Sequence, residues 1–253
     1  MDTIKRTAGD NEQWRYPRFF CGDISGGGFT LTPSDLRHAE KVLRIKRGGK
    51  AVICDGRGTD YLCAYTGGGV FEIIEAFSNA AEPDIRVRLF QCLPKSDKMD
   101  FIVQKAVELG VSEIVPVISA RCVSRPDGKS GPAKSERYRK IAYEAAKQCG
   151  RGKIPAIGEF SDFKAAVRSF DRAGTGIIFY ECGGERLNDI VKNAKPGAAI
   201  DVFIGSEGGF ETAEVDLARR LGITPATLGK RILRVDTASV AAISVLMNLT
   251  GNI

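Results

Sequence analysis

The sequence predicts an α/β protein in two parts, a small β-barrel at residues 14–83 and a larger α/β domain at residues 84–253. Two observations lead to this prediction. Up to Glu82 the chain shows short β-branched or aromatic runs separated by glycine-rich turns, whereas from Ile85 onward strand-like and helix-like patterns alternate. Because Pro83 stands where the pattern changes, we expect the domain boundary there.

The composition is that of a globular protein that can bury a substantial core. The chain has 253 residues, of which 43% are hydrophobic, and it contains no apolar run long enough to span a membrane. Its first residues resemble neither a signal peptide nor a transit peptide, and their polar character predicts a disordered tail at residues 1–13. We therefore expect a cytoplasmic protein without a membrane partner.

Cysteine and histidine usage narrows the chemistry. The seven cysteines are scattered without the spacing of a metal site or a disulfide framework, so we expect reduced thiols and no metal. The single histidine, His38, argues against a Ser-His-Asp or Cys-His nucleophilic mechanism. Any chemistry must therefore use carboxylates, arginines, backbone amides or a cofactor.

Positive charge is clustered rather than evenly spread. The net charge is +6, residues 121–153 hold ten Lys or Arg against three Asp or Glu, and residues 37–50 hold six Lys or Arg against one Glu. Such clusters suit a polyanion such as RNA, because neutralised phosphates release counterions. Solvated helix faces are the alternative explanation.

Strand signals dominate the predicted small domain. Apolar or β-branched runs predict strands at 50–56, 59–66 and 70–77. One helix is expected at 33–43, with Thr32 or Ser34 as its cap.

Strands and helices alternate in the predicted large domain, which indicates a mostly parallel sheet covered by helices. The expected strands are 85–93, 113–119, 154–160, 176–181, 199–205 and 226–229. The expected helices are 96–110, 134–149, 161–170, 185–194, 211–221 and 237–250. Ligands of such sheets bind beyond the carboxyl ends of the strands.

Three late strands end in glycine-rich turns, at 179–185, 204–210 and 228–234. By contrast, the turn after the first strand, "LPKSDKMD", has no glycine, so neither a dinucleotide-binding fingerprint nor a P-loop is present. Glycines let the backbone approach a ligand closely or adopt a positive φ. The three turns therefore predict a ligand site near the C-terminus.

The residues of these turns carry a family resemblance. "IGSEGGF" (204–210) and "LGKRILRVDTA" (228–238), together with "KSDKMDFIVQKAVELGV" (95–111), "EAAKQCGR" (144–151) and "YPRFF" (16–20), resemble the SPOUT class of RNA methyltransferases. Within that class the similarity is to the ribosomal RNA small subunit methyltransferase E family, which methylates N3 of a uridine in 16S rRNA. The resemblance covers nearly the whole chain after the first dozen residues.

The resemblance implies a PUA-like, RNA-binding β-barrel followed by a SPOUT domain with a deep trefoil knot. It further implies S-adenosyl-L-methionine as cofactor, a homodimer formed through the knot region, and 16S rRNA or the assembled small subunit as partner. Two residues depart from the family pattern: Ser206 stands where proline is usual, and Asp236 stands where glutamate is usual.

Site residues follow from the resemblance by position. The implied cofactor contacts are Phe179, Tyr180, Glu181, Ile204, Gly205, Gly209, Leu228, Gly229, Ile232, Leu233 and Ala238. The basic clusters supply the RNA-binding candidates Arg18, Arg44, Lys46, Arg47, Lys95, Arg121, Arg125, Arg137 and Arg151.

Methylation of uridine N3 requires removal of its proton or stabilisation of the resulting anion, for which a carboxylate and an arginine are suited. We expect Arg234 to orient the base and stabilise charge on its carbonyl oxygens, and Glu207 to lie beside the reacting atoms, with Asp236 as the second candidate. The structural alternatives are an Arg234–Asp236 pair that braces the knot and a Glu207 that caps the next helix.

Two other functions remain open at the level of the sequence. One is a SPOUT ribose 2′-O-methyltransferase, and the other is a non-catalytic RNA-binding factor in ribosome assembly that kept the fold.

Overall fold

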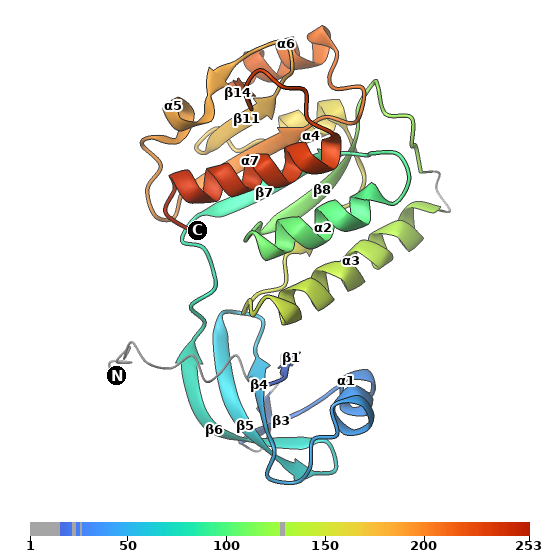
Figure 1. Cartoon of the computed structure of the whole chain (residues 1–253), viewed down its shortest axis with the longest axis vertical. Helices are drawn as coiled ribbons and strands as arrows, with labels where there is room; N and C mark the ends of the chain where they lie inside the picture. Colours follow the sequence, from blue (N-terminus) through green and yellow to red (C-terminus); the bar gives the residue numbers. More distant parts are fainter. Residues whose placement is uncertain (1–15, 22–23, 26, 127–129) are drawn as a thin grey trace. The chain divides into compact units, whose positions relative to one another are not determined.

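The computed structural model describes residues 16–21, 24–25, 27–126 and 130–253, and the tail expected at 1–13 lies outside these ranges (Figure 1). The chain forms two compact units. Of the described residues, the smaller unit comprises those before Pro83 together with Ala146–Ile154, and the larger unit comprises those of Pro83–Ala145 and Pro155–Ile253. The short segment Ala146–Ile154 thus packs with the smaller unit, which the sequence did not indicate.

A six-stranded sheet forms the smaller unit, in the order β1-β4-β5-β6-β3-β2. β1 pairs in parallel with β4, and the other neighbours are antiparallel. The strands are β1 (Arg18–Phe20), β2 (Ile24–Ser25), β3 (Gly28–Thr30), β4 (Lys50–Cys54), β5 (Thr59–Gly67) and β6 (Val70–Ser78). The strands expected at 50–56, 59–66 and 70–77 are confirmed as β4, β5 and β6.

The helix expected at 33–43 is present in two pieces. It begins as α1 (Pro33–Arg37), where the Thr32 side chain accepts a hydrogen bond from the Asp35 N–H, and continues as the π-helical turn η2 (His38–Val42). The core of this unit is aromatic, with Phe19 and Phe71 6.3 Å apart between ring centroids. Cys21 Sγ, directly after β1, lies 3.3 Å from the carbonyl oxygen of Thr30 in β3, so the sheet curls around this core.

The larger unit is built on a parallel sheet in the order β10-β8-β7-β13-β11-β14-β12, with β9 paired to β8. Its strands are β7 (Arg86–Cys92), β8 (Glu113–Ile118), β9 (Ala156–Ile157), β10 (Ser161–Asp162), β11 (Thr175–Phe179), β12 (Glu185–Arg186), β13 (Ala199–Ile204) and β14 (Ile223–Thr227). The parallel sheet is confirmed. The strand expected at 226–229 is displaced, because pairing with β11 places β14 earlier in the chain.

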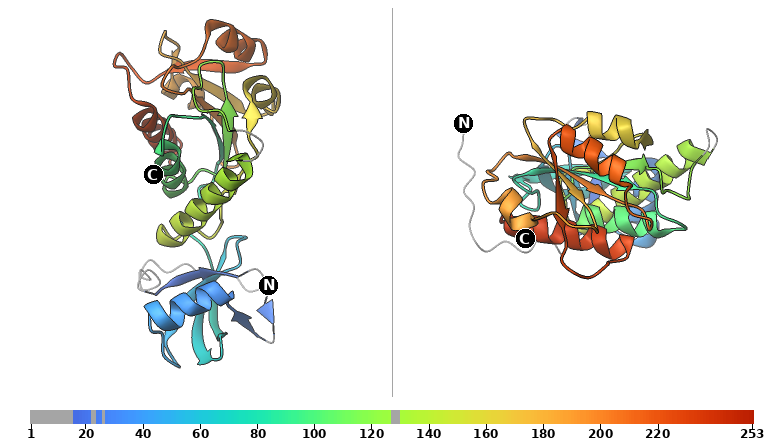
Figure 2. Two further views of the ribbon diagram at one scale, coloured as in Figure 1. Left: turned by 90° about the vertical axis from the view of Figure 1, so that its right-hand side faces the viewer. Right: turned by 90° about the horizontal axis from the view of Figure 1, so that it is seen from above.

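Helices cover both faces of this sheet, with α2 and α7 on one face and α4 and α6 on the other (Figures 1 and 2). The helices of this part are α2 (Lys98–Glu108), α3 (Ser130–Gln148), α4 (Phe163–Arg168), α5 (Leu187–Val191), α6 (Thr212–Arg220) and α7 (Val235–Leu249). In the core, the rings of Phe90 and Phe203 stack at 4.4 Å between centroids. Among the described residues, no helix is long and apolar enough to cross a membrane.

The path of the last segment determines where the loops meet. β14 lies beside β11 on the side away from β13, whereas α7, which follows β14, packs against α2, the helix after β7. The chain therefore crosses back over β11 and β13 between β14 and α7. Because β11, β13 and β14 are parallel neighbours, their carboxyl ends lie at one edge of the sheet, and the loops after them converge there.

Candidate cofactor and RNA site

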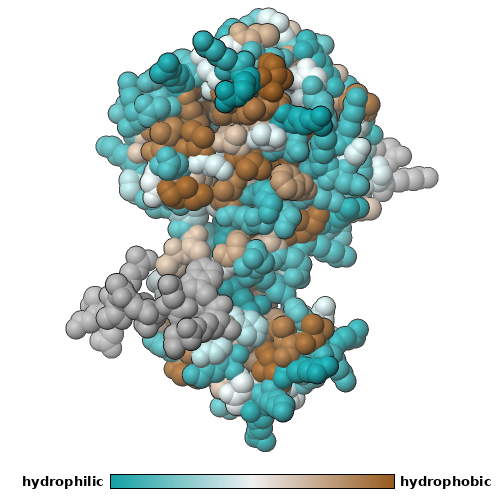
Figure 3. All heavy atoms as spheres, in the orientation of Figure 1, coloured by the Kyte–Doolittle hydropathy of each residue, from teal (hydrophilic) through white to brown (hydrophobic). Residues whose placement is uncertain are grey.

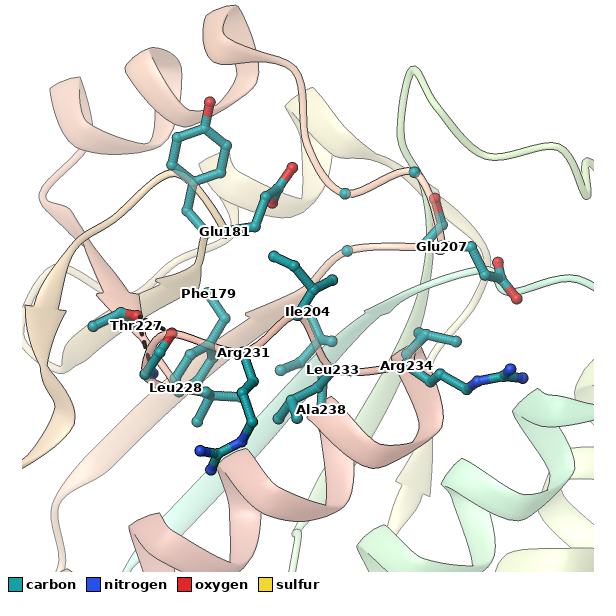
Figure 4. A pocket seen from close by; sticks show the side chains of 18 of the residues that line it. Phe179, Glu181, Ile204, Glu207, Thr227, Leu228, Arg231, Leu233, Arg234 and Ala238 are labelled. Atoms are coloured by element: carbon teal, nitrogen blue, oxygen red, sulfur yellow. Dashed lines mark hydrogen bonds between the residues drawn. The ribbon is translucent and has the colours of Figure 1, made fainter.

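Three loops line a pocket of about 510 Å³ at the carboxyl edge of the larger sheet (Figure 4). The first loop (180–184) follows β11, the second loop (205–211) follows β13, and the third loop (228–234) follows β14. The pocket has the size of a site for a small ligand or cofactor, which is commonly about 300–1,000 Å³. All eleven predicted cofactor contacts line it, namely Phe179, Tyr180, Glu181, Ile204, Gly205, Gly209, Leu228, Gly229, Ile232, Leu233 and Ala238.

The second loop depends on glycine because it passes close to its neighbours. Gly209 has φ 66° and its N–H donates to the Ser206 carbonyl at 2.9 Å, which closes a tight turn. A Cβ at Gly209 would lie 2.4 Å from a carboxylate oxygen of Glu181 in the first loop. A Cβ at Gly205 would lie 3.0 Å from the Cα of Gly209. Gly205 therefore lets the second loop fold closely on itself, and Gly209 lets the Glu181 side chain of the first loop lie against it.

Arg121, which follows β8, joins these two loops from the outside. Its guanidinium donates to the Gly208 carbonyl at 2.9 Å and lies 3.9 Å from Glu181 Oε1. The sequence predicted an RNA contact at Arg121, and the residue is exposed beside Gly208 and Glu181, two residues that line the pocket. It also holds the second loop in place.

Among the described residues, the backbone of the third loop forms hydrogen bonds only at its two ends. At its start, Gly229 has φ 100° and its N–H donates to Thr227 Oγ1 at 3.1 Å, as Figure 4 shows. At its end, Arg234 caps α7, and its carbonyl accepts from Ala238 N–H at 2.7 Å. Between these points, the N–H groups of residues 230–233 donate to no residue that the structure describes. Backbone donors are therefore available to a ligand.

A buried polar network supports the pocket from below. Gln91 is completely buried near the end of β7, and its Nε2 donates to the carbonyls of Cys92 at 2.9 Å and Gly205 at 3.4 Å. Ser239 Oγ of α7 donates to Gln91 Oε1 at 2.6 Å. Gln91 thus links the first strand, the second loop and the last helix. Sequence reasoning missed it, although a glutamine inside the apolar run "IRVRLFQCL" was a signal.

Glu207 is engaged by the turn that precedes α2. Its carboxylate accepts from Lys98 Nζ at 2.7 Å and from the Lys95 N–H at 3.1 and 3.2 Å. Burial alone would raise the pKa of Glu207, but the hydrogen bonds from Lys98, its own N–H and Lys95 outweigh it and lower the pKa below its usual value. Glu207 is therefore an ionised group at neutral pH.

The two structural alternatives for the catalytic candidates are not observed. α6 is capped by Glu211, which forms a capping box with Glu214, so Glu207 has no capping role. Arg234 is exposed and forms no ion pair with Asp236 or with any other residue in the described ranges. Figure 4 shows the Arg234 side chain extending toward the side of the pocket on which Glu207 lies.

Asp236 lies outside the pocket lining, in the first turn of α7. Its Oδ1 atom is buried, and no residue that the structure describes donates a hydrogen bond to it. A carboxylate oxygen left without a donor is costly, so a group outside the described chain is expected to satisfy it.

Two predicted RNA contacts are buried instead. The Arg18 side chain is 9% exposed and pairs with Asp60 at 2.9 Å, and the Arg151 side chain is 4% exposed and pairs with Glu82 at 2.9 Å. Because buried ion pairs cannot reach a phosphate without breaking, Arg18 and Arg151 are structural residues, and their prediction as RNA contacts is wrong.

The other RNA-binding candidates are exposed, namely Arg44, Lys46, Arg47, Lys95, Arg121, Arg125 and Arg137. Arg137 pairs with Asp100, and Arg125 donates to the carbonyls of Ala120 and Cys122. Lys98, Lys230 and Arg231 also line the pocket and were missed, although the quoted motifs contain them.

Comparison with known proteins gives a consistent result. A family model for the RNA methyltransferase domain matches residues 81–247. The chain is 30% identical to the ribosomal RNA small subunit methyltransferase E of Bacillus subtilis, over 85% of this chain and 88% of the relative. It is 34% identical to the enzyme of the same name from Aquifex aeolicus, over 91% and 98% of the two chains.

A solved structure is also similar over almost its full length. It is the ribosomal RNA small subunit methyltransferase E from Neisseria gonorrhoeae bound to S-adenosyl methionine, with a TM-score of 0.83 and 30% identity. The match covers 93% of this chain and 98% of that structure. With the family model and the full-length relatives in agreement, the chain belongs to the ribosomal RNA small subunit methyltransferase E family of RNA methyltransferases.

Proposed function

We propose that this protein transfers the methyl group of S-adenosyl-L-methionine to N3 of a specific uridine in 16S rRNA. The observation that carries the proposal is the pocket, in which every residue that the family resemblance implied as a cofactor contact comes together. The names of the relatives support small-subunit rRNA as the substrate, and the gonococcal relative binds S-adenosyl methionine.

The chemistry of the pocket fits this cofactor. Phe179, Leu228 and Leu233 supply apolar surface for the adenine ring, and the N–H groups of residues 230–233 supply unpaired donors for its polar edge. Gly205 and Gly209 line the pocket without a side chain that would compete with a ligand. When bound, the cofactor supplies an activated methyl group, and the chain's contribution is to align this group with N3.

We assign to Arg234 the role of stabilising the negative charge that develops on the uracil when N3 loses its proton. Arg234 lines the pocket and forms no ion pair in the described part of the chain, so its guanidinium is available to a uracil carbonyl oxygen. A preorganised cation there stabilises the anion that forms when N3 loses its proton. The assignment keeps the role expected from the sequence.

We assign to Glu207 the role of orienting Lys98 and the turn before α2 beside the reacting atoms. The lowered pKa of Glu207 makes it a weak proton acceptor, and its bonds to Lys98 and the Lys95 N–H fix the turn before α2 at the edge of the pocket. Asp236 remains the second candidate for the carboxylate role, since its Oδ1 has no donor among the described residues.

Measuring kcat and the affinity for S-adenosyl-L-methionine separately distinguishes the catalytic roles of Arg234 and Glu207 from a role in cofactor binding. We expect Arg234→Ala to lower kcat by about 10²- to 10³-fold, as removal of one charge-stabilising donor does, with the affinity for S-adenosyl-L-methionine retained. We expect Glu207→Gln to lower kcat as well. Near-normal turnover in either variant removes that residue from the mechanism, and Lys192→Ala, an exposed site outside the pocket, is the control.

The finer architecture is part of the proposal. The return of the chain from β14 to α7 across β11 and β13 supports a deep trefoil knot, and the curled six-stranded sheet supports a PUA-like barrel. We propose that residues 14–83 form the RNA-binding domain and residues 84–253 the SPOUT domain. We further propose a cytoplasmic homodimer that associates through the knot region.

The substrate is proposed to be 16S rRNA, either free or in the assembled small subunit. Its phosphates would be contacted by the exposed basic residues, in the smaller unit Arg44, Lys46 and Arg47, and in the larger unit Lys95, Arg121, Arg125 and Arg137.

The decisive experiment is mass spectrometry of small-subunit rRNA from cells that lack the gene. We expect one N3-methyluridine to disappear and to return on complementation. Persistence of that mark contradicts the proposal, and loss of a 2′-O-methyl mark in its place indicates the ribose methyltransferase. Calorimetry tests the remaining alternative, a non-catalytic RNA-binding factor in ribosome assembly. A folded protein that binds no S-adenosyl-L-methionine would support that alternative.

A further inference from the structure

We infer that the third loop binds the RNA backbone as well as the cofactor, so that cofactor binding and RNA binding strengthen each other. The residues that would contact phosphate are Lys230 and Arg231. This inference rests on the proposed function and concerns the same site.

The first observation is the hydrogen bonding of the third loop. The bond from Gly229 N–H to Thr227 Oγ1 fixes its start, and the cap of α7 at Arg234 fixes its end. The N–H groups of residues 230–233 have no acceptor in the described part of the chain, and Ile232 is 79% exposed. Within the described part of the chain, the loop backbone is therefore hydrogen-bonded only at its two ends, and a ligand in the pocket would supply acceptors for the remaining N–H groups.

The second observation is the charge that the loop carries. Lys230 and Arg231 are both exposed, and neither forms an ion pair with any residue that the structure describes. Of the other basic residues at the pocket, Lys98 pairs with Glu207, and Arg121 contacts Gly208 and Glu181. Arg234, at the end of the same loop, forms no ion pair in the described ranges. Available positive charge on the pocket lining is thus concentrated on the third loop.

The direction in which the Arg231 side chain points favours its contact with a ligand that lies outside the pocket. Figure 4 shows the Arg231 guanidinium extending away from Glu181 and Glu207, while the backbone of the same loop lines the pocket. A target nucleotide in an RNA strand brings its own phosphates to the mouth of the pocket. Lys and Arg side chains at such a position contact phosphate oxygens and fix the register of the strand.

These observations combine into a coupling between the two ligands. A cofactor that binds the N–H groups of residues 230–233 fixes the backbone that carries Lys230 and Arg231, and RNA bound to those side chains fixes the same backbone for the cofactor. By linkage, each ligand raises the affinity of the other by the same factor, commonly about 5- to 150-fold.

The test measures RNA binding with and without S-adenosylhomocysteine, which cannot react and lacks the sulfonium charge. A labelled 16S rRNA transcript is titrated with the full-length protein over a range of salt concentrations. For the wild type we expect S-adenosylhomocysteine to tighten RNA binding by about 5-fold or more. For Lys230→Ala/Arg231→Ala we expect this gain to disappear, and the slope of log K against log salt to shrink by roughly 1.4–1.8, the value for two phosphate contacts.

The matched control is Lys192→Ala/Lys195→Ala, which removes the same charge from exposed positions outside the pocket lining. This control variant should still bind RNA more tightly in the presence of S-adenosylhomocysteine, as the wild type does. Calorimetry without RNA should give the Lys230/Arg231 variant a wild-type affinity for S-adenosylhomocysteine. If that affinity falls, the two side chains are cofactor ligands, and the inference is overturned.

Failure of the inference and failure of the proposed function give different results. A wild type that binds S-adenosylhomocysteine and methylates rRNA, but shows no coupling, overturns the inference alone. A Lys230→Ala/Arg231→Ala variant that keeps both the coupling and the wild-type slope of log K against log salt also overturns the inference alone. A wild type that binds no S-adenosylhomocysteine overturns the proposed function, and the inference falls with it.

Discussion

Gly209 is the residue where the second loop depends most directly on the lack of a side chain. Its φ of 66° strains any other residue, and an added Cβ would lie 2.4 Å from the Glu181 carboxylate. We expect Gly209→Ala to weaken S-adenosyl-L-methionine binding by about 10-fold, because the strained turn would shift and the Glu181 side chain would be displaced, and both line the pocket. Isothermal titration calorimetry measures the effect.

Gly197→Ala is the control for Gly209→Ala. Gly197 also has a positive φ, 84°, but an added Cβ there would meet no atom within 4 Å. Gly197→Ala should therefore lower the free energy of unfolding by about 1 kcal/mol through backbone strain while leaving cofactor affinity unchanged. Equal cofactor affinities in the two variants would contradict the role given to Gly209.

Glu207 should contribute to stability in a pH-dependent way. Its pKa is lowered in the folded state, so its contribution is fully present above the unfolded pKa, about 4.3, and is lost as the pH falls through the lower folded value. At pH 7 we expect Glu207→Gln to lower the free energy of unfolding by up to about 1 kcal/mol, since the Lys98 pair is partly exposed.

Urea unfolding at several pH values tests the Glu207 prediction. The difference between wild type and Glu207→Gln should shrink below about pH 4. Glu185→Gln, at an exposed glutamate with no ion pair among the described residues, should show no such pH dependence. A Glu207→Gln effect that is constant down to strongly acidic pH would show that the charge of Glu207 is not its cause.

At the scale of elements, one buried ion pair joins strands of the smaller sheet. Arg18 of β1 donates two hydrogen bonds of 2.9 Å to Asp60 of β5, and Asn79, directly after β6, donates to the same carboxylate at 2.7 Å. Asp60 is 1% exposed. We expect Asp60→Asn to cost roughly 3–5 kcal/mol of unfolding free energy, because it leaves the Arg18 cation buried without an anion.

Thermal and urea unfolding measure the Asp60→Asn effect. Glu72→Gln, at an exposed position of β6 in the same sheet, is the control and should change stability by less than about 0.5 kcal/mol. A cost for Asp60→Asn as small as that of the control would mean that Arg18 is solvated, and would restore it as a candidate for RNA contact.

How well each element could be predicted depends on its local signal. The helix expected at 96–110 is α2, and the helix expected at 237–250 is α7, because each carries a strong apolar face. β14 was displaced because only Ile223 and Ala226 are buried in it and Pro225 interrupts the pattern. The two-residue strands β10 and β12 are too short to leave a pattern, and they form by pairing with β8 and β14.

The sequence predicted the loops of the candidate site but not the way in which they come together. Glycine turns and the family motifs identified the three loops, but the meeting of these loops depends on the strand order β13-β11-β14, which the linear pattern does not encode. The bond between Gln91 and Ser239 joins residues 148 positions apart. Arg18 and Arg151 were misassigned for a related reason: a charge count does not distinguish a buried, paired arginine from a free one.

At the scale of the whole molecule, the larger unit exposes an apolar surface on α2 and α7 (Figure 3). Phe101 of α2 is 45% exposed, and Val245 and Leu249, one turn apart on α7, are 43% and 37% exposed. α2 and α7 pack against each other, so these exposed side chains lie on two adjacent helices. Grouped apolar side chains of this kind are typical of an interface, and the proposed homodimer would cover them.

We expect Val245→Asp/Leu249→Asp to convert a wild-type dimer into a folded monomer, because two carboxylates would lose their hydration on association. Light scattering at micromolar concentration gives the mass, and circular dichroism checks the fold. Ile74→Asp, at a 53% exposed apolar residue of the smaller unit, should remain a dimer. A dimeric double variant would place the interface elsewhere.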